Sequence, residues 1–248
     1  TDKVEYWDGT KWYGITYEFA YPTSLKIYLN ASDTDSYPGT GTTWFDLTSN
    51  GNNGAINGAS WNAGGYFQFD GINDYVNLTG QAPFSNSTTQ TNDIKCFTGW
   101  IKLDAGTRGM LYTVSSTTNN SDYFTCQIRN TSPFIFVAGR NGTTNDQFTD
   151  SVSYAPNTDW HHYVFQLTGT TREIYIDGVS RTISRDNRGS ATNTSWVSFP
   201  SYASATTHAI QQGRASSPYY GYGKVSKVQY YSSPLTQAEI TALFTEGE

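Results

Sequence analysis

The fold is decided by residues 25–78, which read LKIYLNASDTDSYPGTGTTWFDLTSNGNNGAINGASWNAGGYFQFDGINDYVNL. Apolar and more polar side chains alternate in residues 25–30, and a period of two is typical of a half-buried β-strand. The alternation returns at residues 66–69 and 75–78, which the turn sequence DGIND joins. The polar run between these strands is rich in Ser, Thr, Gly and Asn, and the apolar-rich patch WFDL at residues 44–47 interrupts it. The pattern predicts an all-β protein whose irregular loops are anchored by a few aromatic side chains.

The composition excludes several classes of function. A chain of 248 residues is long enough for one large β domain or two small ones. Charged residues make up only 15%, the net charge is -6 and no basic run occurs, so a nucleic-acid partner is not expected. No apolar stretch is long enough to span a bilayer, so membrane insertion is not expected either. Hydroxyl and amide side chains in place of charge are typical of extracellular, fibrous or virion proteins, although β-sheets alone also favour Tyr and Thr.

The rest of the chain continues the pattern of short strands and polar loops. Strands are expected at residues 4–7, 12–15, 96–103, 109–114, 123–128, 133–138, 160–167, 172–176, 209–213 and 224–231. Polar loops are expected at residues 81–93, 141–150 and 185–207. Short antiparallel strands at turn-spaced intervals predict an antiparallel β-sandwich.

The first 20 residues are expected to form a separate β-hairpin. Two strand-like segments flank an Asp8-Gly9 pair, which is a strong signal for a two-residue hairpin turn. The hairpin is either an edge of the main domain or the end of a preceding module. We therefore divide the chain into residues 1–20 and a main domain of residues 21–248.

Two local signals concern the end of the chain. The apolar phase slips between Val225 and Val228, which predicts a β-bulge in the last strand. Thr236 and Glu239 form a capping box and predict a short C-terminal helix. The two cysteines, Cys96 and Cys126, lie in expected strands, where they either pair or remain buried thiols.

Several motifs, in this order, resemble a known family. They are YPGTGTTWFDL at residues 37–47, NGNNG at 50–54, FDGINDYV at 69–76, WHH at 160–162, IYIDG at 174–178 and the segment 223–236. Together they resemble the LamG-like jelly-roll domains of the concanavalin A-like lectin/glucanase superfamily. The resemblance implies a concanavalin A-like jelly roll with a short C-terminal helix. The SYPGTGTTW form of the loop resembles modules of bacterial surface proteins and of tailed-phage virions, which implies an extracellular or virion-surface location.

The resemblance does not extend to catalytic residues. Glucanases of this superfamily carry their two carboxylates on one strand in a Glu-x-Asp-x-(x)-Glu pattern, and no glutamate of this chain is spaced in that way. His161 and His162 would point to opposite faces of a strand, which favours structural roles over a shared metal. We therefore expect no catalysis, although a polysaccharide lyase that uses Tyr with Arg or His would escape this test.

Sugar binding needs aromatic faces for the apolar side of the ring and polar groups that read its hydroxyls. The loops supply both, although their tyrosines can also simply pack the loops. The candidate ligand-binding residues are Trp196, Tyr202, Tyr219, Tyr220, Tyr222, Arg140, Asn145, Asp146 and Arg214.

Calcium is a separate expectation, which the resemblance raises because many LamG-like domains bind Ca²⁺ through oxygen ligands. The oxygen-rich candidates are Asp46, Asn50 and Asn52. Family members often carry an acidic residue in the last strand, where this chain has Ser226 and Lys227. This departure removes an expected ligand and weakens the case for Ca²⁺.

The sequence as a whole predicts a non-catalytic carbohydrate-binding or adhesion domain. Its partner would be a cell-surface or polymeric glycan, and its setting a tail fibre, a capsid-associated protein or another extracellular protein. The first alternative is a structural or decoration domain that contacts other virion or surface-protein subunits. The second is a divergent glycan-degrading enzyme.

Overall fold

The computed structural model describes residues 3–7, 10, 12–16, 21–78, 94–104, 108–118, 123–129, 135–140, 147–188, 205–214, 216 and 218–248, some of them by their backbone alone. The elements in chain order are β1 (Lys3–Trp7), β2 (Trp12–Thr16), β3 (Leu25–Asn30), β4 (Thr43–Trp44), β5 (Gly54–Asn57), β6 (Ser60–Asn62), β7 (Tyr66–Asp70), β8 (Tyr75–Asn77), β9 (Cys96–Leu103), β10 (Arg108–Ser116), β11 (Tyr123–Arg129), β12 (Ile135–Arg140), β13 (Gln147–Val152), β14 (Trp160–Thr168), β15 (Thr171–Ile176), β16 (Val179–Ser180), β17 (Ser184–Arg188), β18 (Ala205–Ile210), β19 (Tyr222–Tyr231) and α1 (Gln237–Glu246).

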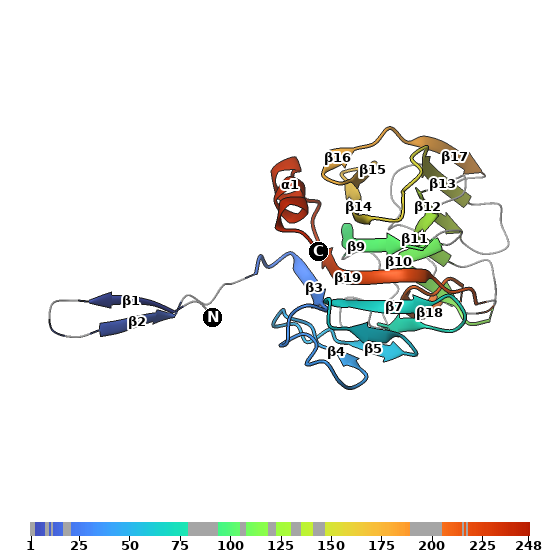
Figure 1. Ribbon diagram of the computed structural model, residues 1–248. Coiled ribbons are helices and arrows are strands. Elements are labelled where there is room, and N and C mark those ends of the chain that lie inside the picture. The colour runs from blue at the N-terminus through green and yellow to red at the C-terminus, as the bar shows by residue number, and fades with distance from the viewer. Residues whose placement is uncertain are drawn as a thin grey trace.

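Within the described residues the strands build two large antiparallel sheets that face each other, and β1 and β2 form a hairpin of their own (Figure 1). The β10 sheet has the order β17-β13-β12-β11-β10-β18-β8-β5-β4. The β19 sheet has the order β16-β15-β14-β9-β19-β7-β6, and β3 also pairs with β19. The predicted antiparallel β-sandwich is therefore confirmed, as is the predicted N-terminal hairpin.

The strand β19 is central to its sheet. One edge pairs with β9, while the other edge pairs first with β7 and then with β3. The register against β9 shifts between Val225 and Val228, which confirms the predicted bulge. Because the bulge adds a residue, Val225 and Val228 both reach the core and are fully buried.

The main hydrophobic core lies between the two sheets. The side chain of Trp44 is fully buried, and its ring centroid lies 4.8 Å from that of Phe67. The aromatic patch therefore anchors the long loop, as the sequence predicts. From the opposite sheets, Tyr230 and Tyr112 also meet in this core, with ring centroids 5.6 Å apart.

The strand β10 carries a second bulge, which sets the direction of its side chains. Its register against β11 shifts between Met110 and Tyr112, so that Leu111 is the extra residue. Tyr112 faces the core, and simple alternation would turn Met110 and Arg108 the same way. The bulge reverses the direction of these two side chains. Met110 and Arg108 therefore point to the outer face, where each lies opposite an outward-facing residue of β11. The hydroxyl of Tyr230 crosses the core and donates to the Leu111 carbonyl at 2.6 Å.

The DGIND turn has a different role from that of a hairpin turn. Its flanking strands belong to different sheets, because β7 pairs within the β19 sheet and β8 within the β10 sheet. The carboxylate of Asp70 accepts from the backbone N–H of Ile72 at 2.8 Å, and that of Asp74 accepts from the N–H of Asp70 at 3.0 Å. The turn therefore carries the chain from one layer of the sandwich to the other.

The helix α1 covers the outer face of the β19 sheet. Its capping box is formed as predicted, since Thr236 accepts from the N–H of Glu239 while the Glu239 carboxylate accepts from the N–H of Thr236. At the other end, Lys227 donates to the Glu246 carboxylate at 3.1 Å and to the Gly247 carbonyl at 2.8 Å.

The described part of the chain contains no helix with the length and apolar character needed to cross a membrane.

Two expectations about the loops need correction. The polar loop expected at residues 141–150 overlaps β13, and the one expected at 185–207 overlaps β17 and the start of β18. Strand formation depends on cross-strand partners more than on intrinsic propensity, and β13 lies between β12 and β17. The loop expected at residues 81–93 lies outside the described residues.

The two cysteines are free thiols, which decides between the alternatives that the sequence leaves open. Cys96 belongs to β9 and Cys126 to β11, so they lie in opposite sheets. Both are fully buried, and burial raises the pKa of each thiol well above its usual value. Neither cysteine is therefore poised to react as a thiolate.

Candidate functional site

The loop after Trp44 is held together by the carboxylate of Asp46. One oxygen accepts from the N–H groups of Tyr28, at 2.9 Å, and Thr48, at 3.1 Å. The other accepts from the Thr48 hydroxyl at 2.7 Å and from the N–H of Asn52 at 2.9 Å. The side-chain amides of Asn50 and Asn52 donate to strand β3, so all three calcium candidates take part in the hydrogen bonding of the loop.

No group of three or more His, Cys, Asp and Glu side chains within the described ranges could hold a metal. Lys227 occupies the position at which the family often has an acid, and it is committed to the end of α1. The neighbouring Ser226 is buried. Calcium binding at Asp46 therefore stays a prediction, and both oxygens of that carboxylate already accept hydrogen bonds within the loop.

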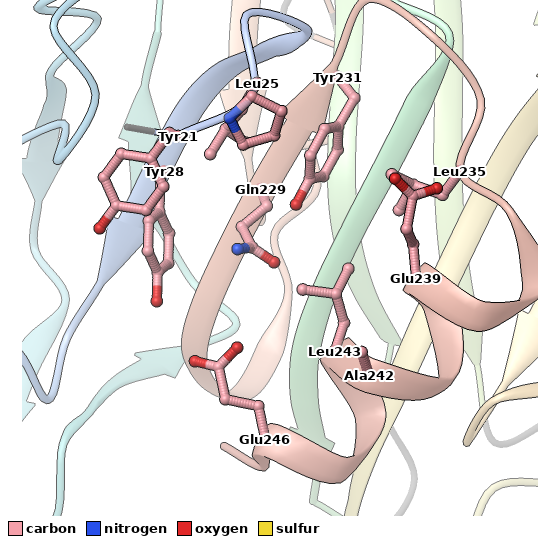
Figure 2. Close-up of a pocket in the computed structure, with 11 residues that line it drawn as sticks. Tyr21, Leu25, Tyr28, Gln229, Tyr231, Leu235, Glu239, Ala242, Leu243 and Glu246 are labelled. Atoms are coloured by element: carbon pink, nitrogen blue, oxygen red, sulfur yellow. The ribbon is translucent and has the colours of Figure 1, made fainter. Parts of the chain in front are cut away.

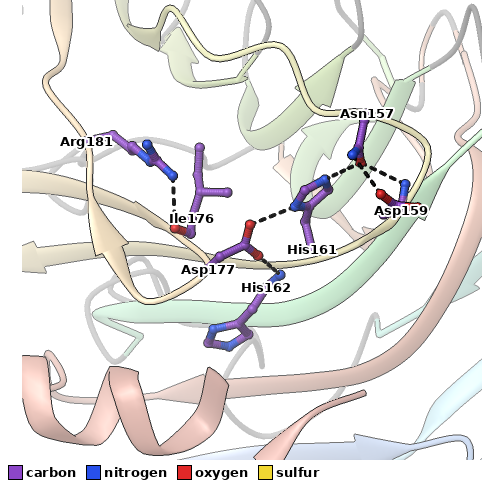
Figure 3. A network of polar contacts seen from close by, with 7 residues as sticks. All are labelled: Asn157, Asp159, His161, His162, Ile176, Asp177 and Arg181. Carbon is purple, nitrogen blue, oxygen red and sulfur yellow. Dashed lines mark hydrogen bonds and ion pairs between the residues drawn. The ribbon is translucent and has the colours of Figure 1, made fainter. Parts of the chain in front are cut away.

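A polar network surrounds His161 (Figure 3). Its Nδ1 lies 2.7 Å from the Asp177 carboxylate, and its Nε2 lies 2.8 Å from Oδ1 of Asn157. Burial alone would raise the pKa of Asp177, but hydrogen bonds from His161 and from the N–H of His162 outweigh it and hold that pKa below its usual value. Asp177 and Gly178 have φ angles of 53° and 74°, as the turn between β15 and β16 requires.

His162 points away from this network, as the alternation along a strand predicts. Its Nε2 lies 2.6 Å from the Thr98 hydroxyl, and its ring centroid lies 5.4 Å from that of Trp100. Burial lowers the pKa of His162 to about 4. The two histidines therefore have separate structural roles and do not share a site.

A pocket of about 390 Å³ lies between α1 and the strands β3 and β19 (Figure 2). Its side chains include Tyr21, Tyr28 and Leu243, and its two carboxylates are already engaged. Glu239 belongs to the capping box and Glu246 pairs with Lys227. The lining is otherwise largely apolar and aromatic, and its further polar groups are the Gln229 amide and the hydroxyls of its tyrosines (Figure 2).

The outer face of the β10 sheet is unusual because it is polar and yet partly buried. In β11 the alternate residues Phe124, Cys126 and Ile128 belong to the core. The other alternate residues face outward, and among them Gln127 is 0% exposed. They are Tyr123, Thr125, Gln127 and Arg129.

Three arginines gather on this face. Arg108 of β10 lies directly opposite Arg129 of β11 in the register of the two strands. The guanidinium carbon of Arg108 lies 4.9 Å from the centroid of the Tyr219 ring, and that of Arg214 lies 4.7 Å from the centroid of the Tyr123 ring. Both distances are typical of cation–π contacts. Below, "the arginine cluster" denotes Arg108, Arg129 and Arg214 together with Tyr123, Gln127 and Tyr219.

Gln127 lies at the centre of the arginine cluster. Its Oε1 accepts from Nε of Arg129, and its Nε2 donates to the Tyr219 hydroxyl at 3.4 Å. Arg108, Arg129, Arg214 and Tyr219 are all partly exposed, whereas Gln127 is not. The cluster therefore has a buried polar floor and a surface of guanidinium and phenol groups that solvent can reach.

The charge of the cluster is positive. The pKa of Arg129 is lowered, first by burial and then by the positive charge of Arg108, with a further contribution from Arg214. The negative charges of ionised Tyr219 and Tyr123 would act in the opposite direction and raise the pKa of Arg129. In a chain with a net charge of -6, this face is a local exception.

Two glycines allow close packing in the segment that carries Tyr219. Gly213 donates to the Tyr219 carbonyl at 2.8 Å, and a Cβ at position 213 would collide with the Tyr219 ring. Gly221 donates to the Gln211 carbonyl at 2.7 Å, and a Cβ there would collide with the Gln211 side chain. Gln211 has a φ of 62°, which is uncommon for a residue other than glycine.

Among the predicted ligand-binding residues whose side chains the structure describes, Tyr219 and Arg214 lie together in the arginine cluster. Tyr220 packs instead against Tyr75, with ring centroids 6.1 Å apart. Tyr222 is 39% exposed and lies against Gly71 in the DGIND turn. The four residues Trp196, Tyr202, Asn145 and Asp146 lie outside the described residues. Of Arg140 only the backbone is described, in register with Tyr123.

The sequence analysis missed most of the arginine cluster, namely Arg108, Tyr123, Gln127 and Arg129. One signal was present, because the polar residues of 123–129 alternate with apolar ones. That alternation indicates an outward polar face. It does not indicate which strand lies next to it.

Residues 69–241 match the sequence profile of the laminin G-type family described as the concanavalin A-like lectin/glucanases superfamily. No curated protein sequence matches the chain.

Solved structures are also similar in fold. Trypanosoma rangeli sialidase is 13% identical with a TM-score of 0.61, over 91% of this chain and 33% of the sialidase. The same sialidase in complex with sialic acid is 14% identical with a TM-score of 0.59, over the same shares of the two chains. The Ruminococcus gnavus IT-sialidase CBM40 is 11% identical with a TM-score of 0.54, over 72% of this chain and 96% of the other. This chain thus spans about a third of the length of the first two, and these likenesses concern the fold.

Proposed function

Because the chain belongs to the concanavalin A-like lectin/glucanase superfamily, we propose that it is a non-catalytic carbohydrate-binding domain that binds glycan at the arginine cluster. The observation that carries the proposal is the partly exposed group of arginines and tyrosines above the buried Gln127. Arginine supplies hydrogen-bond donors for sugar oxygens, and tyrosine supplies both a ring face and a hydroxyl. The similarity of fold to a carbohydrate-binding module supports the same conclusion.

The absence of catalysis is part of this proposal. Glycosidases need two carboxyl groups on either side of the scissile bond, ~5–5.5 Å apart in retaining enzymes and ~6.5–9.5 Å in inverting ones. The groups of the arginine cluster are guanidinium, phenol and amide, and none of these is a carboxyl group. A site of this composition offers donors and ring faces to a sugar, but it does not offer the pair of carboxyl groups that hydrolysis by most glycosidases uses.

The cellular setting is proposed from the sequence. A charged fraction of 15% and the SYPGTGTTW loop support an extracellular or virion-surface protein, such as a tail fibre or a capsid-associated protein. In that setting the partner is a cell-surface or polymeric glycan, and the function is adhesion.

A glycan array probed with the full chain tests the proposal directly. We expect binding to a restricted set of glycans and no release of reducing sugar from a polysaccharide panel. Retention on the array should fall for a Gln127→Ala variant, because Gln127 positions both Arg129 and Tyr219. A chain that binds no glycan would contradict the proposal, and sugar release would point to an enzyme.

One observation favours a second candidate function, which is assembly with other subunits. Within the described residues β1 and β2 pair only with each other, and an isolated two-stranded hairpin is marginally stable in water. A hairpin of this kind gains stability when another chain covers it. Light scattering of the full chain tests this candidate, which predicts a defined oligomer that a Gly9→Pro change in the hairpin turn disrupts.

A further inference from the structure

Arg108 and Arg129 form a like-charged pair across two neighbouring strands. Side chains directly opposite each other on one face of an antiparallel pair lie close together, and like charges at such positions are destabilising. The arrangement is made by the Leu111 bulge, which turns Arg108 away from the core and toward Arg129. Folding therefore places two positive charges together at a cost, on a face that solvent reaches.

The third guanidinium adds to this charge. The guanidinium group of Arg214 lies over the ring of Tyr123, which is one of the β11 residues on the same face as Arg129. Its Nε is buried and has no hydrogen-bond partner in the part of the chain that the structure describes. Among the described residues, no carboxylate lies within ion-pair distance of Arg108 or Arg214.

The guanidinium groups are also held in place before any ligand arrives. Arg108 and Arg214 rest on tyrosine rings, and Arg129 donates to the buried Gln127. A guanidinium group is a planar fork, and it fits the two oxygens of a carboxylate with two parallel hydrogen bonds. A prearranged fork loses less rotamer freedom on binding than a free side chain.

We propose that the arginine cluster binds the carboxylate of an acidic sugar, so that the glycan recognised here carries a uronic acid or a sialic acid. This inference rests on the proposed function and specifies its ligand. A neutral sugar would satisfy the donors of the cluster, but it would bring no negative charge to Arg108 and Arg214, for which the described residues supply no carboxylate. A carboxylate satisfies the donors and also offsets the repulsion between Arg108 and Arg129.

The test is a chemical-shift titration of the ¹⁵N-labelled full chain with monosaccharides in matched pairs. N-acetylneuraminic acid is compared with its methyl ester, and methyl glucuronide with methyl glucoside. In each pair the ring is kept and the negative charge is removed. A third probe, methyl glucoside 6-sulfate, keeps a negative charge but lacks a planar carboxylate.

We expect one of the two acids to bind and its neutral partner to bind at least about tenfold more weakly. Which acid binds distinguishes a sialic acid from a uronic acid. Binding of the acid should weaken as the ionic strength rises from about 0.02 to about 0.5 M, because a partly exposed charge pair is screened by salt.

Three variants tie the binding to the cluster. Arg108→Gln and Arg214→Gln should each weaken binding of the acid by about tenfold or more, and they should weaken the binding of the neutral sugar by a smaller factor, because only the acid also loses a charge partner. Arg108→Lys keeps the charge but loses the fork, so its loss should be smaller. Arg181→Gln is the matched control, because Arg181 also rests on a tyrosine ring, that of Tyr154, but follows β16 in the other sheet. Thermal unfolding verifies that each variant is folded.

The outcomes separate this inference from the proposed function. Equal binding of acid and neutral partner, or of the sulfate ester and the carboxylic acids, would overturn the inference and leave the proposed function standing. Loss of acid binding in Arg181→Gln to the same extent as in Arg108→Gln would also overturn it. A chain that binds none of the probes, and no glycan on the array, would overturn both.

Discussion

Gln211 is joined to Met110 by both its backbone and its side chain. Its N–H donates to the Met110 carbonyl at 2.9 Å, while its side-chain Oε1 accepts from the Met110 N–H at 3.1 Å. These two bonds continue the pairing of β10 and β18 beyond the end of β18, to a residue whose φ of 62° ends the strand. They fix the point at which the segment that carries Arg214 and Tyr219 leaves the sheet.

The first prediction concerns this double link. Gln211→Ala leaves the buried N–H of Met110 without its acceptor, which should cost about 1–3 kcal/mol of unfolding free energy. Gln211→Gly loses the same bond but relieves the positive φ, so it should be destabilised less than Gln211→Ala. Urea denaturation measures both variants. Equal stability of Gln211→Ala and the wild type would show that the link contributes nothing.

The second prediction concerns the contact between Gly213 and Tyr219. Gly213→Ala places a methyl group where the Tyr219 ring lies, so the ring must move away from Arg108 and glycan binding should weaken. A double-mutant cycle isolates the cause. If the collision is responsible, adding Gly213→Ala to Tyr219→Ala should have little further effect on stability. An additive loss would indicate that Gly213 is needed for another reason.

The third prediction concerns acid pH. Burial lowers the pKa of His162 and of His208 to about 4, whereas an unfolded histidine titrates near 6.5. Below about pH 6.5 the unfolded chain therefore binds protons that the folded chain does not, and stability falls until about pH 4. Each histidine should contribute on the order of 3 kcal/mol to this loss, at up to about 1.4 kcal/mol per pH unit.

Variants assign this loss of stability to single residues. His208→Gln and His162→Gln remove one titrating group each, so each should flatten the decline in unfolding free energy between about pH 6.5 and 4. Asp177 acts in another window, because a lowered carboxyl pKa contributes stability that is lost only below about pH 4. Urea denaturation at a series of pH values separates the loss of stability caused by the histidines from the loss caused by Asp177. A wild-type curve that is flat between pH 6.5 and 4 would contradict the assignment.

The fourth prediction concerns Asp46 and calcium. The four hydrogen bonds to its carboxylate lead us to expect that EDTA leaves the Tm of the wild type unchanged. Asp46→Asn should lower the free energy of unfolding by about 1–3 kcal/mol, because an amide oxygen cannot replace both carboxylate oxygens. A fall in Tm with EDTA that Ca²⁺ reverses would show instead that the loop binds the metal.

The sequence predicted those parts of the fold that depend on local patterns. The bulge between Val225 and Val228 shows in the phase of the apolar residues, and the capping box shows in the spacing of Thr236 and Glu239. Trp44 could be identified as an anchor because it belongs to the apolar-rich WFDL patch, which interrupts a polar loop. In each case a few neighbouring residues carry the whole signal.

The candidate site could not be predicted in the same way. Arg108 and Arg129 meet only because β10 pairs with β11 in one register and because Leu111 bulges. Neither fact can be read from the residues around either arginine. Tyr219 and Tyr220 are adjacent in a tyrosine-rich segment, and composition alone gave no reason to separate them.

The bond from the Tyr230 hydroxyl to the Leu111 carbonyl means that the bulge that directs Arg108 to the outer face is held from inside the protein. Tyr230→Phe would leave that carbonyl without its donor and loosen the bulge, although Tyr230 lies in the opposite sheet. Arg214 and Tyr219, by contrast, lie between the end of β18 and the start of β19 and are not part of the bulge. Under the proposed function, changes in this segment would therefore alter the contributions of Arg214 and Tyr219 to ligand choice, while β10, β11 and the Leu111 bulge keep Arg108 opposite Arg129.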